Sequence, residues 1–180
     1  MTPPVLLVED WHPAGEDHWQ RRWMPRVPGA LRLARPDALP PKRAEWCGRI
    51  AEAILEQSAP VVLVAHGLAC IAVAHLPAAA AERVAGAMLV APTDPERRAL
   101  LADFAPVPHA ALPYRSIVVA SSNDPFCPVR LAGAYARAWG SEFVRMQNAG
   151  HLDSDSGHGE WPLGFALLQS LTLTEPLTIP

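Results

Sequence analysis

The sequence predicts an α/β domain in three layers, with a mostly parallel sheet of five or six strands between two layers of helices. Two observations predict this fold class. Short apolar runs alternate about five times with longer segments of helical period, a pattern typical of parallel strands joined by crossover helices. The run at residues 61–64 is apolar at every position, as expected of a central strand that is covered on both faces.

The expected strands are short and rich in valine, leucine and isoleucine. They lie at residues 5–8, 61–64, 87–90, 116–120 and 143–146, and a further short extended piece lies at 31–33.

Apolar residues at helical spacing predict the helices between these strands. They are expected at residues 18–24, 41–57, 68–76, 129–139 and 163–171. Trp19 and Trp23 lie four residues apart on one face of the first helix, and Pro41 near the start of the second suits a helix N-terminus. Leucines predict the buried face of the last helix: Leu163, Leu167, Leu168 and Leu171.

Length and composition limit the class of protein. The 180 residues suit one domain over 1–180, with residues 172–180 expected to fray. The net charge of -3 and the lack of a basic run argue against a nucleic-acid partner, and no apolar run has the length of a membrane span. Three widely spaced cysteines and the lack of an N-terminal signal sequence predict a cytoplasmic protein without disulfides. The sequence sets no oligomeric state.

The candidate site lies where the predicted strands end, because ligands of open α/β sheets bind beyond the carboxyl ends of the strands. Asp10 and Trp11 follow the first strand, Asp124 follows a late strand, and His151 follows the next. The segment 65–69, Ala-His-Gly-Leu-Ala, joins a buried strand to a helix. It has the small residues of a nucleophile elbow, but its centre is Gly67 rather than serine.

These stretches together resemble the small serine-hydrolase family of α/β-hydrolases that includes the retinoblastoma-binding serine hydrolase and its bacterial relatives. The stretches that match are spread over nearly the whole chain: Glu-Asp-His-Trp-Gln at 16–20, residues 61–66, residues 87–92, Ser-Ser-Asn-Asp-Pro at 121–125, Gly-His at 150–151 and residues 156–162. The resemblance implies a compact α/β-hydrolase-like fold without a large lid.

The resemblance also assigns the site residues. It implies that Asp124 is the catalytic acid, that His151 is the base, and that Gly67 stands at the nucleophile position. The backbone N–H of Leu68, with one from the loop at Asp10 or Trp11, is expected to form the oxyanion hole. This chain departs from the family pattern at Gly67, at Ala69, and at Glu9 and Asp10, where a carboxylate would oppose an oxyanion.

A triad without its hydroxyl forms no acyl-enzyme, and loss of a serine nucleophile costs on the order of 10⁶ in kcat in other enzymes. We therefore expect a family member that is inactive or very weak, with a retained Asp124–His151 dyad and a pocket for a small ester or amide. His66 is expected to support the turn by a hydrogen bond, and no metal or cofactor is expected. The alternatives are an active carboxylesterase in which Gly67 replaces a serine, and a dyad that activates water directly.

Overall fold

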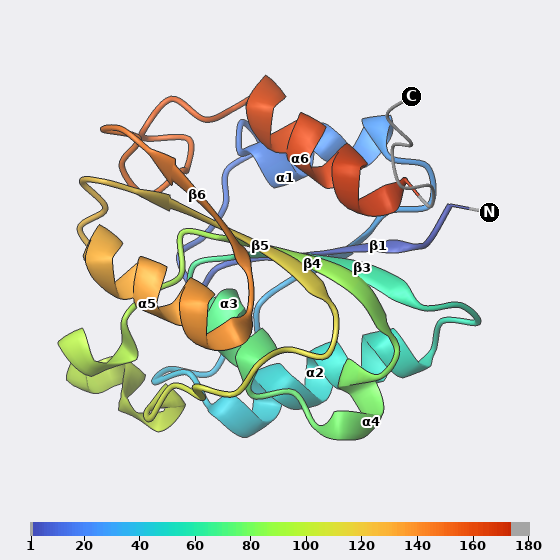
Figure 1. The fold of residues 1–180 in the computed structure, drawn as a ribbon, viewed down its shortest axis with the longest axis horizontal. Coiled ribbons are helices and arrows are strands. Elements are labelled where there is room, and N and C mark those ends of the chain that lie inside the picture. The colour runs from blue at the N-terminus through green and yellow to red at the C-terminus, as the bar shows by residue number, and fades with distance from the viewer. Residues whose placement is uncertain (1, 174–180) are drawn as a thin grey trace.

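The computed structural model describes residues 2–173 of the chain (Figure 1). Within these residues lies one six-stranded sheet, in the order β2-β1-β3-β4-β5-β6, and every neighbouring pair is parallel. The strands are β1 (Val5–Val8), β2 (Leu31–Leu33), β3 (Val61–His66), β4 (Val84–Val90), β5 (Arg115–Ser121) and β6 (Glu142–Met146).

Helices cover both faces of this sheet, which confirms the predicted three-layer fold. In Figure 1, α1 and α6 lie on one face, and α2, α3, α4 and α5 lie on the other. Their bounds are α1 (Trp19–Trp23), α2 (Arg43–Leu55), α3 (Leu68–Ala74), α4 (Ala78–Ala81), α5 (Val129–Trp139) and α6 (Pro162–Thr172), with 3-10 turns at Met24–Arg26, Pro95–Arg97 and Ala99–Phe104.

The alternation of side chains along each strand divides the core into two layers. In β1, Leu6 and Val8 pack with the helices α2, α3 and α5, whereas Val5 and Leu7 pack with α1 and α6. The apolar run of β3 is completely buried on both faces. The run therefore marks a central strand, as the sequence predicts.

The elements differ from the predictions mainly at their ends. β3 continues to His66 and β4 begins at Val84, while α4 and the turns over residues 95–104 were not predicted. Leu168 is buried as expected, but Leu163 is 49% exposed, because the buried residues at this end of α6 are Trp161 and Gly164 and Leu163 lies off the face that they define. Helix α6 continues to Thr172, and the part of the expected tail from residue 174 lies outside the described residues.

The parallel topology decides where the site can be. Because all the strands run in the same direction, the loops that follow β1, β3, β5 and β6 meet at one edge of the sheet. Over residues 2–173, none of the helices combines the length and the apolar character needed to cross a bilayer.

Candidate functional site

A tight turn at Gly67 joins β3 to α3. Gly67 has φ of 61°, in the region that favours glycine, and its N–H donates to the Val90 carbonyl over 2.9 Å. Ala65 and Ala69, two residues before and after it, are fully buried. The backbone therefore has the form predicted for a nucleophile elbow, without a hydroxyl at its apex.

Asp124 and His151 lie together across the cleft from this turn. The Nδ1 atom of His151 is 2.9 Å from Oδ2 and 3.1 Å from Oδ1 of Asp124, and both side chains are buried. The Phe126 N–H donates to Asp124 Oδ1 over 2.9 Å, which fixes the carboxylate at the start of the loop after β5. The predicted dyad is thus present as a pair in contact.

Side chains that the sequence reasoning did not single out hold these two loops together. Ser121 accepts the Ala149 N–H over 2.8 Å and donates to Asn123 Oδ1 over 2.8 Å. Asn123 Oδ1 also accepts the N–H of Gly150, the residue before His151. The sequence carries one signal for these two residues: they belong to the Ser-Ser-Asn-Asp stretch, in which polar residues precede the acid at the end of a strand.

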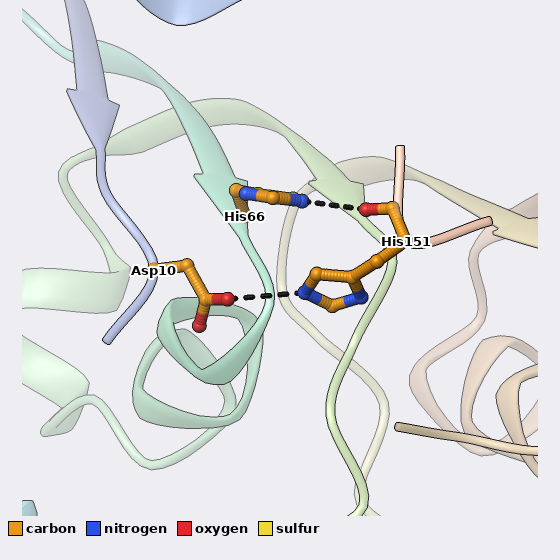
Figure 2. Close-up of side chains that lie close together, drawn as sticks. All are labelled: Asp10, His66 and His151. Carbon is orange, nitrogen blue, oxygen red and sulfur yellow. Dashed lines mark hydrogen bonds and ion pairs between the residues drawn. The ribbon is translucent and has the colours of Figure 1, made fainter. Parts of the chain in front are cut away.

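The carboxylate of Asp10 occupies the centre of the site. Its Oδ1 atom accepts two backbone hydrogen bonds of 2.8 Å, from the N–H of Leu68 and from the N–H of Trp11. Its Oδ2 atom lies 3.0 Å from Nε2 of His151 and 3.2 Å from Nδ1 of His12. Figure 2 shows the Asp10 carboxylate facing the His151 ring.

The position of this carboxylate corrects the expectation for the loop after β1. A Cβ built on Gly67 would overlap the carboxylate atoms of Asp10. The carboxylate therefore lies where the side chain of residue 67 would project. It also accepts hydrogen bonds from the N–H groups of Leu68 and Trp11, which were expected to form the oxyanion hole. Glu9 points elsewhere, with Oε1 3.4 Å from Arg21 and 3.2 Å from Arg32.

Charge explains why a buried carboxylate is stable here. Burial alone would lower the pKa of His151, but hydrogen bonds with Asp10 and Asp124 outweigh burial and raise it to about 10. Burial alone would raise the pKa of Asp10, whereas its hydrogen bonds with His12 and His151 hold it well below the usual range. At neutral pH the site therefore holds an imidazolium between two carboxylates.

Two further histidines stand beside this group in their neutral form. Burial, followed by the charge of His151, lowers the pKa of His66 to about 4; burial, followed by the charge of His66, lowers that of His18 to about 3. The Nε2 atom of His66 donates to the His151 carbonyl over 2.8 Å (Figure 2). This bond joins His66 to the loop after β6, and the expected role of His66 in supporting the turn stays a prediction.

A cavity of about 680 Å³ opens onto these groups. Its lining includes Asp10, His66 and His151 from the predicted set, but Leu68 and Trp11 contribute to the site through their backbone N–H groups instead. The remaining wall comes from residues 12–18, 125–126, 150 and 153–156. His18 belongs to this wall, and its Nε2 atom is buried without a hydrogen-bond partner.

The histidines, the aspartate and the cysteine near the turn favour neither metal binding nor thiol chemistry. Ligand atoms of Asp10, His66 and His151 lie within 4.8 Å of one another, but the bonds described above already join these groups to each other. Cys70, near the turn, is fully buried, and burial raises its thiol pKa well above the usual value. The reactive thiolate form is therefore disfavoured.

The sheet order, the turn after β3 and the acid–histidine pair at the strand ends together define an α/β-hydrolase. A family model described as "Serine hydrolase" matches residues 5–170, and the chain belongs to this family. Among curated proteins, none matches the sequence.

Solved structures agree with this assignment. A YdeN-like hydrolase from Pectobacterium atrosepticum is 28% identical, with a TM-score of 0.85 over 95% of this chain and 91% of its own. The ydeN gene product of B. subtilis is 21% identical, with a TM-score of 0.76 over 94% and 98%. Est1E from Butyrivibrio proteoclasticus, 9% identical, has a TM-score of 0.71 over 96% and 89%. The last two comparisons concern the fold alone.

Proposed function

We propose that this chain is a serine-hydrolase family member without serine-dependent esterase activity, which holds a small organic molecule in the cavity beside Asp124 and His151. One observation carries the proposal. The Asp10 carboxylate lies where a nucleophile at position 67 would project, and it accepts the backbone N–H of Leu68. Esters and amides, the compounds expected from the family resemblance, are the first ligands to test.

The same observation argues against the two alternatives. A serine at position 67 would overlap the Asp10 carboxylate, so restoring the hydroxyl alone does not rebuild a triad. Direct activation of water requires a free Nε2 on His151, but this atom is bonded to Asp10, and the raised pKa keeps the ring protonated at neutral pH.

Restoration of the serine tests the proposal. The unmodified chain, Gly67→Ser and Asp10→Gly/Gly67→Ser are compared by p-nitrophenyl acetate turnover and by labelling with a fluorophosphonate. Only the double variant is expected to label, with ester turnover at least ~100-fold above the unmodified chain, because it has both a hydroxyl and a free oxyanion hole.

The control adds His151→Ala to the double variant, and this change should abolish the gained turnover. Labelling of the unmodified chain by fluorophosphonate at the rate of the double variant would contradict the proposal. A double variant that folds but gains no activity would show that the pocket has lost more than its nucleophile.

Two finer assignments belong to the same proposal. We place the chain in the branch of the family that includes the retinoblastoma-binding serine hydrolase, on the strength of the shared stretches at residues 16–20, 121–125 and 150–151. We also assign it to the cytoplasm. Its three cysteines are free thiols, which suits a reducing compartment.

A further inference from the structure

We infer that Asp10 is itself a nucleophile: its Oδ2 atom attacks a saturated carbon that bears a leaving group, and His151 then delivers water to the resulting aspartyl ester. This inference rests on the proposed absence of serine chemistry and adds an activity to it. The substrate class is a small alkyl electrophile, such as an alkyl halide or an epoxide.

The two oxygens of Asp10 have different surroundings, and each surrounding suits one task. Oδ1 is held by the N–H groups of Leu68 and Trp11, both at 2.8 Å. Oδ2 faces His151 at 3.0 Å, in the wall of the cavity. A carboxylate with one oxygen anchored and the other at the cavity is oriented for attack, and aspartate is an established covalent nucleophile in other enzymes.

The entrance to Oδ2 is on the side of His12. The His12 ring lies 3.2 Å from Oδ2, its side chain is 36% exposed, and it lines the cavity. His151, by contrast, is fixed by Asp124 and buried. A substrate carbon therefore reaches Oδ2 by displacing the partly exposed His12 ring and leaving the contact with His151 in place.

In the first step, a lone pair of Oδ2 forms the new O–C bond while the bond between carbon and leaving group breaks. With an alkyl halide the leaving group departs with the electron pair as halide; with an epoxide the ring C–O bond breaks, and the resulting alkoxide stays attached to the alkyl group. Asp10 becomes a neutral alkyl ester, in which Oδ1 is the carbonyl oxygen. The imidazolium proton of His151 passes to the alkoxide or, with the weakly basic halide, to solvent.

In the second step, water attacks Cγ of the Asp10 ester, and His151 accepts the proton of that water. Esterification removes one of the two carboxylates that raise the pKa of His151, so the ring becomes a base in this intermediate while Asp124 keeps it oriented. The Leu68 and Trp11 N–H groups then stabilise the negative charge that develops on Oδ1. Collapse releases the alcohol, which takes up a proton, and restores the carboxylate and the imidazolium. The net reaction consumes one water and converts an alkyl halide into an alcohol and a hydrogen halide, or an epoxide into a vicinal diol.

The oxygen balance distinguishes this route from direct attack of water on the substrate. In the covalent route, the alcohol of the first turnover takes its oxygen from Asp10, and the oxygen of water enters the Asp10 carboxylate. In direct hydrolysis, the alcohol takes its oxygen from water, and Asp10 is unchanged.

The experiment is a single turnover in H₂¹⁸O with the full chain in excess over n-butyl bromide or styrene oxide. Peptide mass spectrometry is expected to find ¹⁸O in Asp10, with unlabelled oxygen in the first product. Asp10→Asn should incorporate no label. Glu9→Gln is the matched control, since Glu9 is the neighbouring buried carboxylate and contacts Arg21 and Arg32 outside the cavity; it should label like the unmodified chain.

A second variant makes the intermediate visible. His151→Gln retains an N–H near Oδ2 but accepts no proton from water, so an alkyl adduct on Asp10 should accumulate and appear in the intact mass. Absence of ¹⁸O from Asp10 in the unmodified chain with both compounds, or ¹⁸O in the first alcohol, would overturn the inference. Fluorophosphonate labelling of the unmodified chain would instead contradict the proposed function, so the two failures are distinguishable.

Discussion

The cleft consists of two halves, which differ in how closely each matches the catalytic site expected of a serine hydrolase. The dyad half, formed by the loops after β5 and β6, holds Asp124 and His151 at 2.9 Å with a network of hydrogen bonds between the loops. The elbow half, formed by the loops after β1 and β3, keeps the turn at Gly67 and the two N–H donors. In place of a hydroxyl, it contains the carboxylate of Asp10.

The difference shows that Gly67 and Asp10 form a coupled pair in the elbow half. Gly67 provides the space that the Asp10 carboxylate fills, and Asp10 satisfies the N–H groups that the turn leaves free. The dyad half supplies the imidazolium that makes a buried carboxylate stable. The charge of the dyad half thus limits which side chains the elbow half can hold, and the coupling between Gly67 and Asp10 can be measured.

The largest expected effect is on stability when the pair is broken at Gly67. Gly67→Ser places a Cβ at φ of 61° and against the Asp10 carboxylate, so we expect a loss of about 3 kcal/mol in the free energy of unfolding, measured in urea. Gly29→Ser is the control, because Gly29 has φ of 72° and nothing within 4 Å of an added Cβ.

The control should lose only about 1 kcal/mol, from backbone strain alone. Asp10→Gly/Gly67→Ser should recover part of the loss, since the overlap is then removed. If Gly67→Ser costs no more than Gly29→Ser, the two residues of the elbow half are not coupled.

Much of the fold could be predicted because the sheet is buried on both faces. The runs at residues 5–8, 61–64 and 117–120 are apolar at every position, as expected of strands that are covered on both faces. The short α4, Ala78–Ala81, escaped prediction because four alanines carry no amphipathic period. The assignment of Leu163 to the core was wrong because a glycine carries no apolar signal: the packed face is centred on Gly164 and Leu168 rather than on the leucine stripe.

The site, too, could be predicted only in part. Chain order and strand ends were enough to pair Asp124 with His151, because topology alone brings them together. That Asp10 reaches the elbow depends on a side-chain direction and on contacts to residues 68 and 151, far away in the sequence. Spacing carries no information about such contacts, so the loop after β1 was interpreted as an obstacle rather than as an occupant.

A second expected effect concerns the charge shared between the two halves. Asp10→Asn removes one of the two carboxylates around His151, so its pKa should fall from about 10 toward the ordinary 6.5, as measured by NMR titration of the ring. Glu9→Gln should leave it unchanged. An unchanged pKa in Asp10→Asn would mean that Asp124 alone sets the charge of the ring.

The same group gives a pH dependence of known sign. The pKa of His151 is higher in the folded chain than in the unfolded chain, so its contribution to stability is complete below pH 6.5 and is lost as the pH rises toward 10. The free energy of unfolding should therefore fall over this window, by up to about 1.4 kcal/mol per pH unit. Asp10→Asn should show a flatter profile, and an equally steep one would contradict this assignment.

The smallest expected effect lies in the dyad half and tests what holds its loops. Ser121→Ala leaves the buried Ala149 N–H without its acceptor and should cost about 1–2 kcal/mol, with faster hydrogen exchange at that amide. Ser170→Ala removes a hydroxyl that donates within α6 to Leu167 and should cost less, without altering the Ala149 amide. Equal costs, with no change in exchange, would mean that packing rather than this network positions His151; the dyad half would then depend on its core, just as the elbow half depends on its carboxylate.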